Sequence, residues 1–383
     1  MSDYMCTRIT LLFSLFFLVV SYRPGFSQAT MLDDKEMQDV VSKGLEKMYN
    51  LEFEEAEKYF LKVKQKYPDH PAYELLNSMS LSWEMMYDNS FKKRGKEHLN
   101  YLEEAVKKAA KLLENDNNDP EGIFFTLAGR ASIALYYAQT NETLKSVNEA
   151  RKAYYLIKKA DAWKDRLMDF NLPVGLYNYY VVQYPENHSV FKPFMFFFMK
   201  GDKARGLELM DKCSRKGILS RTEATYYLSH IYLRYEEDYA KSIPYGATLV
   251  KEFPNNIYFK INYCEALIGN QQYKEAEFIA YDLYKSETPA GKIAACTYYG
   301  LLNEKYFKHP DKARNYYNQA LQLARNCEFP VQDFTGQCYA GLGRVYHSSG
   351  EKEKAIEAYK KCLDETDYLS LMREAKDYLN KHD

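Results

Sequence analysis

The sequence predicts an all-α solenoid built from helix-turn-helix repeats. Gly (17) and Pro (12) are scarce among the 383 residues and Tyr (37) is plentiful, which favours long helices with many half-buried aromatic side chains. Apolar residues recur at the three- and four-residue steps of a helix. A glycine is followed twelve residues later by an alanine near both ends of the chain, at Gly44 and Ala56 and at Gly343 and Ala355.

The C-terminal copy of this pattern predicts one helical hairpin. Gly343 and Tyr346 lie three residues apart and so share a helix face. Gly350 ends that helix, and Ala355 and Tyr359 line the next one. The small pair lets two antiparallel helices approach closely while the aromatic rings fill the space beside them.

The N-terminal copy adds a second hairpin of the same design. Gly44 and Ala56 are followed by Phe60 on the same face as Ala56, and Pro68 stops the second helix. Weaker copies between the two ends give further repeat-core positions at Ala240, Ala276, Ala313 and Tyr317. We therefore expect repeats along most of the chain, some of them degenerate.

In their order, Leu342, Gly343, Tyr346, Ala355 and Tyr359 resemble a tetratricopeptide repeat. The resemblance implies a right-handed superhelix whose concave face comes mostly from the first helix of each repeat and binds a peptide or a partner helix. Polar positions expected on these first helices give the candidate partner-binding residues Lys43, Lys47, Arg344 and His347.

Segment 161–215 departs from the repeat pattern. Its stretch from Val190 to Met199 is apolar on all sides, so we expect it to be buried. Around it, Leu172 to Tyr180 and Gly201 to Leu207 loosely resemble the tetratricopeptide-39-like family, which includes a yeast mitochondrial outer-membrane inclusion-clearance protein. The resemblance implies a helical insertion between two repeat blocks. It is either a packed core that joins the blocks or a contact for a partner or a membrane.

The N-terminus is typical of an export signal. Arg8 precedes an apolar run, Pro24 and Gly25 break it, and the small residues around Ala29 suit cleavage before Thr30. The run is shorter than the ~20 residues of a spanning helix, although a retained anchor stays open. We expect an exported protein of the periplasm or cell envelope of a Gram-negative bacterium, with peripheral envelope association as one option.

Four segments follow from these patterns: a signal peptide at 1–29, N-terminal repeats at 30–160, the hydrophobic helical insertion at 161–215, and C-terminal repeats at 216–383. The last segment includes a C-terminal capping helix, because a terminal repeat otherwise exposes its apolar face.

The sequence shows no pattern for catalysis, metal or cofactor binding. Its histidines are scattered singly, and no glycine-rich phosphate loop occurs. The acidic stretch 114–122 has Pro120 where a calcium loop needs an oxygen ligand, so we expect a turn in which Asp119 caps the next helix. Six cysteines follow the signal, either as buried thiols or with one bridge, Cys327–Cys338 or Cys338–Cys362.

Composition and pattern together predict a non-enzymatic scaffold for protein partners. The formal net charge is −1, which gives no overall field to hold nucleic acid. The alternative is a ligand-binding module that holds a glycan or an apolar small molecule against the aromatic insertion. A closed cavity beside Phe191, Phe194 or Tyr180 would favour this alternative.

Overall fold

A computed structural model describes residues 31–88, 90–187, 189–325, 327, 332–366 and 368–382. The predicted signal peptide therefore lies outside the described residues. Within them the chain forms α-helices, three short 3-10 helices and no β-strand. The short helices are η1 (Met31–Asp33), η2 (Met168–Phe170) and η3 (Ser189–Phe197).

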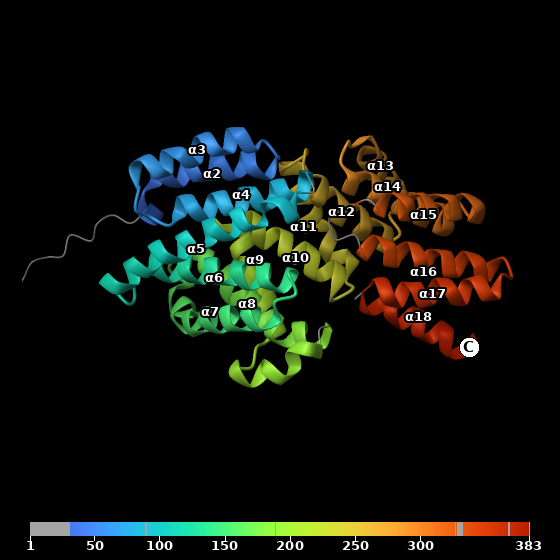
Figure 1. Ribbon diagram of the computed structural model, residues 1–383. Coiled ribbons are helices and arrows are strands. Elements are labelled where there is room, and N and C mark those ends of the chain that lie inside the picture. The colour runs from blue at the N-terminus through green and yellow to red at the C-terminus, as the bar shows by residue number, and fades with distance from the viewer. Residues whose placement is uncertain are drawn as a thin grey trace, which may run out of the picture.

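The α-helices pack in succession as antiparallel pairs (Figure 1). The pairs are α2 (Lys35–Tyr49) with α3 (Phe53–Lys66), α4 (Ala72–Asp88) with α5 (Phe91–Asn115), α6 (Pro120–Gln139) with α7 (Thr143–Trp163), α8 (Asn171–Asn187) with α9 (Lys203–Lys216), α10 (Arg221–Arg234) with α11 (Tyr239–Glu252), α12 (Ile257–Gly269) with α13 (Tyr273–Lys285), α14 (Pro289–Lys305) with α15 (Pro310–Ala324), and α16 (Gln332–Ser348) with α17 (Lys352–Glu365). Helix α18 (Leu369–His382) ends the array. The predicted all-α solenoid is confirmed.

Six hairpin turns share a residue in the left-handed backbone region. In four of these turns, the left-handed residue comes seven positions after a small residue of the first helix. A small residue of the second helix follows it five positions later. These four triplets are Gly44, Leu51 and Ala56; Ala134, Asn141 and Ser146; Cys264, Gln271 and Ala276; and Gly343, Gly350 and Ala355. The left-handed residue reverses the chain, and the backbone of the next residue then bonds back to the last helical turn, as Glu52 N does to Lys47 O at 2.9 Å.

The other two turns contain one extra residue. Their triplets are Ser229, Glu237 and Ser242, and Gly300, Lys308 and Ala313. The buried small residue of α11 is thus Ser242, whose Oγ donates to Ser229 O at 2.8 Å, whereas Ala240 is exposed. The repeat position that we assigned to Ala240 is therefore wrong by two residues, and the extra residue of the longer turn accounts for one of them.

The first helices of the pairs form an inner layer, and the second helices form an outer one. Helices α10, α12, α14 and α16 pack side by side in order, and most residues of α12 and α14 are buried all round. The outer helices have one buried stripe each, for example Ala276, Ile279, Ala280 and Leu283 of α13. Burial therefore explains why the inner helices lack the amphipathic pattern of the outer ones.

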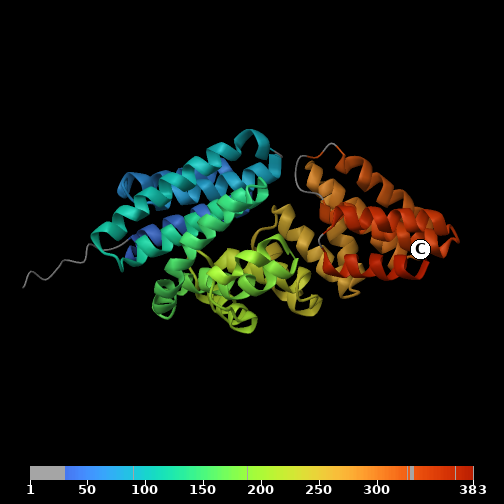
Figure 2. The same ribbon diagram turned by 60° about the horizontal axis from the view of Figure 1, so that its bottom comes forward.

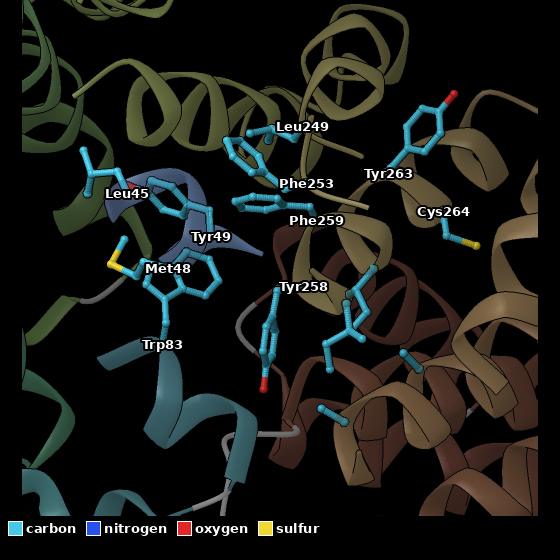
Figure 3. Close-up of a cluster of buried hydrophobic side chains, with 14 of the residues drawn as sticks. Leu45, Met48, Tyr49, Trp83, Leu249, Phe253, Tyr258, Phe259, Tyr263 and Cys264 are labelled. Carbon is cyan, nitrogen blue, oxygen red and sulfur yellow. The ribbon is translucent and has the colours of Figure 1, made fainter. Parts of the chain in front are cut away.

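The N-terminal pairs also pack on the middle of the chain. Figure 3 shows Tyr49 at the end of α2 and Trp83 of α4 against Phe253 and Phe259, which flank the turn into α12. The ring centroids of Tyr49 and Phe253 lie 5.4 Å apart, and so do those of Trp83 and Phe259. The solenoid is consequently closed on itself between its first and its sixth helix pair.

The segment predicted as an insertion is helical. Helix α7 extends past the predicted boundary at residue 160, and α8 and α9 pack together like the other pairs, with the backbones of Gly175 and Gly206 in close approach. The expected burial of 190–199 is wrong for Val190 and Phe196, which are 58% and 78% exposed. The segment projects from the stack after α8 (Figures 1 and 2).

Helix α18 covers the last repeat, as the capping prediction required. Ala375 is fully buried, and the Tyr378 ring packs on Tyr359 with centroids 4.5 Å apart. In the part of the chain that the structure describes, no helix combines the length and the apolar character needed to cross a bilayer.

Candidate functional site

One face of α10 lies on the inner side of the closed solenoid. Glu223, Tyr226, Tyr227, His230 and Arg234 follow one another at steps of three, one, three and four residues, which places them along a single face of the helix. Glu223, Tyr226, Tyr227 and His230 are half-buried, whereas only 6% of the Arg234 side chain is exposed. We call this set the α10 face.

Aromatic side chains of two other helices border the α10 face. Trp83 of α4 contacts Tyr226 with ring centroids 6.0 Å apart, and Tyr180 of α8 contacts Tyr227 with centroids 6.5 Å apart. The His230 ring lies nearly parallel to that of Tyr226, at 6.0 Å and 29°. The result is a polar strip between aromatic walls, which is a common composition for protein binding surfaces.

Glu265 of α12 is the centre of the polar contacts. It pairs with the Arg234 guanidinium and accepts hydrogen bonds from Tyr298 Oη at 3.1 Å and Gln337 Nε2 at 2.9 Å. Its donors come from α10, α14 and α16, so one carboxylate ties four inner helices together. The other side of Arg234 lies 4.1 Å from the centre of the Tyr368 ring.

His230 is held neutral. Burial and the nearby positive charge of Arg234 lower the pKa of His230 to about 3. A neutral imidazole has one donor and one acceptor nitrogen, and so it can pair with either group of a peptide bond. Burial likewise raises the pKa of Glu223, the carboxyl at the other end of the α10 face.

Several polar atoms at this site have no hydrogen-bond partner among the described residues. They are His230 Nδ1, Arg234 Nε, Gln337 Oε1 and Tyr368 Oη, and each is shielded from solvent. Leaving such a group unpaired costs about 1–3 kcal/mol. A cluster of unpaired buried donors and acceptors on one surface is therefore a site where a bound molecule gains hydrogen bonds.

The described residues also bear on metal binding and on cysteine reactivity. In the described ranges, no group of three or more His, Cys, Asp or Glu side chains is placed to hold a metal ion. The six described cysteines are present as thiols and not as disulfides. Burial raises the pKa of Cys296 to about 11 and that of Cys338 to about 12, which disfavours the nucleophilic thiolate.

Two clefts lie elsewhere on the molecule. One of about 470 Å³ is lined by Asp211, Tyr232 and Tyr245, and one of about 190 Å³ by Phe124 and Phe170. Neither cleft is lined by Phe194 or Tyr180. The alternative prediction of a ligand-binding module required a closed cavity beside these residues.

The four predicted partner-binding residues do not form one site. Lys43 and Lys47 lie on α2 and pair with Asp39 and Glu52, each at 2.8 Å. His347 lies near the end of α16 and contacts the Tyr378 hydroxyl at 3.1 Å. None of the four belongs to the α10 face, and their role in partner binding stays a prediction.

Arg344 belongs to a structural network instead of an exposed surface. Its guanidinium bonds Glu304 at 2.5 Å and Glu374 at 2.9 Å, and Tyr317 Oη donates to the same Glu304 at 2.6 Å. Only 27% of the Arg344 side chain is exposed. Its expected exposure is wrong because α18 and α14 supply carboxylates on either side of it.

Most of the predicted repeat-core residues are buried. This holds for Gly44, Ala56, Phe60, Ala276, Ala313, Tyr317, Gly343, Ala355 and Tyr359. Tyr346 is half-buried, and Pro68 is exposed just after α3 ends. These residues pack the helices of each pair together, and none of them belongs to the α10 face.

Sequence reasoning missed the α10 face, although a signal for it existed. The spacing of Glu223, Tyr226, His230 and Arg234 marks one helix face of large polar side chains. Such a face usually points to solvent, and only the contact between Trp83 and Tyr226 shows that it points inward.

The fold and this inner face define the molecule as a helical-repeat protein of the solenoid class. Residues 295–364, from α14 to α17, match the family model described as tetratricopeptide repeat. The matched segment contains the hairpin of Gly343 and Ala355, so the resemblance to a tetratricopeptide repeat predicted for that hairpin is confirmed there. No curated protein matches the sequence.

Solved structures of helical-repeat proteins show distant similarity. Human IFIT1, solved as a dimer with m7Gppp-AAAA, is 14% identical over 91% of this chain and 72% of its own, with a TM-score of 0.36. The C-terminal part of a TPR repeat-containing protein from Cytophaga hutchinsonii is 12% identical over 88% of this chain and 98% of its own, with a TM-score of 0.27. Yeast Tom70 is 11% identical over 91% and 96%, with a TM-score of 0.25.

Proposed function

We propose that the protein is a non-enzymatic scaffold that binds an extended segment of a partner protein along the α10 face. The tetratricopeptide repeats support an interaction scaffold in general. The observation that favours this surface is the set of unpaired buried polar atoms, His230 Nδ1, Arg234 Nε and Gln337 Oε1.

An extended peptide suits these atoms chemically. Each peptide unit offers one N–H donor and one C=O acceptor, and side chains alternate on either side of the backbone. The Arg234 Nε donor and the Gln337 Oε1 acceptor match that pair of groups, and the partly exposed edges of the packed Tyr226 and Tyr227 rings add apolar surface beside them. A protein partner is therefore the favoured ligand class.

The charge of the site argues against nucleic acid as the ligand. Glu223 and Glu265 accompany the single guanidinium of Arg234, and that guanidinium is already paired with Glu265. Phosphate binding requires an excess of Lys and Arg, which the α10 face lacks. We extend this to the proposal that the protein acts without nucleic acid.

We also propose that the scaffold works in the cell envelope of a Gram-negative bacterium. The support for this location is the export-signal pattern of residues 1–29. The scaffold would then meet its partner after export. We include in this proposal that the scaffold associates peripherally with the surface of an envelope membrane.

The test compares partner binding with fold stability. The full-length protein is used to capture a partner from envelope extract, the captured protein is mapped to a short peptide, and its dissociation constant is measured by calorimetry. His230→Leu removes a buried polar atom that has no partner in the free protein, so we expect equal or higher stability in urea but about tenfold weaker binding.

The matched control is the double variant Lys43→Glu/Lys47→Glu, which changes the candidate residues of α2. Unchanged affinity in the control and loss in His230→Leu support the α10 face. If the control loses the peptide and His230→Leu keeps it, the binding surface is the one predicted from sequence, and our assignment is wrong.

A further inference from the structure

The projecting segment 189–200 exposes apolar side chains outside the helix pairs. It contains η3 and reads SVFKPFMFFFMK. Val190, Phe196 and Met199 are 58%, 78% and 40% exposed. Burying such side chains is favourable, and a group of them held in water marks an interaction surface.

The base of this segment is fixed to α7 and α8. Tyr177 Oη donates to Met199 O at 2.7 Å, and the Phe198 ring meets Tyr154 edge-on with centroids 5.6 Å apart. Tyr154 in turn stacks on Tyr177, with centroids also 5.6 Å apart. The return into α9 is packed as well, since a Cβ on Gly201 would lie 2.3 Å from Asn178 O.

These contacts hold one end of the segment while its tip extends from the stack (Figures 1 and 2). Tyr155, next to Tyr154 on α7, is 66% exposed and adds apolar surface beside the base. The projecting shape is thus built into the fold by aromatic packing at its foot.

The charges of the segment indicate which surface it meets. Lys192 and Lys200 are both exposed, and residues 189–200 contain no Asp or Glu. Aromatic and aliphatic side chains flanked by lysines are the composition that enters the boundary between lipid headgroups and acyl chains. Each lysine near an anionic membrane surface adds attraction, which salt weakens.

We infer that segment 189–200 inserts its apolar tip into the interfacial region of an anionic lipid bilayer and so attaches the scaffold to a membrane surface. The insertion is shallow, because interfacial segments reach only about 5–10 Å into the bilayer. This inference does not depend on the proposed peptide site, since the α10 face and segment 189–200 use different residues.

The first test reports on the tip itself, using the full-length chain. Phe196→Trp places an indole at a 78% exposed position of the segment, and the control Phe278→Trp places one at a 72% exposed position of α13. The probe is vesicles of phosphatidylethanolamine with one quarter phosphatidylglycerol, some carrying bromine on the acyl chains. We expect the Phe196→Trp variant alone to shift its emission to the blue and to be quenched by bromine.

A second test measures vesicle co-sedimentation at low salt. Val190→Ser/Phe196→Ser should lower the partition coefficient about tenfold or more relative to Phe278→Ser/Tyr281→Ser, which removes two exposed side chains of α13. Lys192→Glu/Lys200→Glu should remove the preference for phosphatidylglycerol over neutral lipid.

Three results would overturn the inference. The first is absence of bromine quenching in Phe196→Trp, and the second is equal quenching in vesicles without phosphatidylglycerol. The third is a blue shift that grows with protein concentration and needs no lipid, which would assign the segment to contact between two copies of the chain.

Discussion

The side chain of Asn256 joins two parts of the chain that are 207 residues apart. Its Nδ2 donates to Tyr49 O at 2.9 Å, and its Oδ1 accepts from the backbone N of Tyr258 at 3.0 Å and so caps α12. Asn256 is fully buried. One amide therefore serves both the local start of a helix and the closure of the solenoid.

Asn256→Asp separates these two roles. The carboxylate keeps the cap but cannot donate to Tyr49 O, so two oxygens face each other in a buried place. We expect a loss of about 1–3 kcal/mol in the free energy of unfolding, measured in urea by circular dichroism. Asp202→Asn, the reverse exchange at the exposed cap of α9, is the control and should change the free energy by less than about 0.5 kcal/mol. Equal effects of the two variants would show that the bond to Tyr49 contributes nothing.

Gly341→Ala tests the packing of Tyr317. A Cβ on Gly341 would lie 2.3 Å from Tyr317 Cζ, and one on Gly300 would lie 2.3 Å from Cε1, so the ring is confined between two inner helices. Because the ring cannot move away, we expect Gly341→Ala to destabilise the protein by about 1–3 kcal/mol.

Gly95→Ala is the matched control for this glycine. Gly95 lies inside α5, and a Cβ added to it would lie 3.4 Å from Tyr136 Cε2, which is an ordinary van der Waals distance. There alanine should stabilise the helix by about 0.5–1 kcal/mol. Thermal unfolding of both variants should give shifts of opposite sign, and a shared sign would contradict the packing argument.

Arg344→Met tests the network at the C-terminal cap. It removes the cation between Glu304 and Glu374 and leaves Glu304, whose side chain is 16% exposed, without its charged partner. Breaking such a pair costs about 3–5 kcal/mol. The control Lys43→Met breaks an exposed pair with Asp39 and should leave the free energy of unfolding nearly unchanged, because water screens that pair. The triple variant with Glu304→Gln and Glu374→Gln should recover part of the loss in a urea titration, since it removes the unpaired charges.

His230 gives the stability a dependence on pH. Its pKa is about 3 in the folded protein and 6.5 in the unfolded chain, so below pH 6.5 the unfolded state binds a proton that the folded state does not. Its contribution to stability is present above pH 6.5 and is lost as pH falls toward 3, with a slope of at most about 1.4 kcal/mol per pH unit. In urea titrations at pH 7 and pH 5, His230→Leu should lose less stability on acidification than the wild type. Parallel losses would show that His230 is not the responsible group.

The features that the sequence predicted are local. Gly44 and Ala56, or Gly343 and Ala355, lie within one hairpin, so their spacing and the turn between them are visible in a few residues. Asp119 is a similar case: its carboxylate accepts from Gly122 N at 2.6 Å and caps α6, as its place before Pro120 indicated.

The features that the sequence did not predict depend on distant partners. Arg344 looked like an exposed cation because Glu304 and Glu374 are far from it in sequence. The α10 face has the sequence pattern of an ordinary polar stripe, and its inward orientation depends on Trp83, which contacts Tyr226 and is far from it in sequence. The apolar run after Val190 predicted burial, because periodicity shows how apolar a segment is but not whether another element lies over it.

The closure between Tyr49 and Phe253 has a consequence during synthesis. A ribosome adds about 5–20 residues per second, so roughly 10–35 s pass between the appearance of Trp83 and that of Phe259. During this interval the inner surfaces of α2 and α4, with Tyr49, Met48 and Trp83, have no partner to cover them. The nascent N-terminal half therefore exposes apolar surface for longer than a repeat array with only neighbouring contacts would.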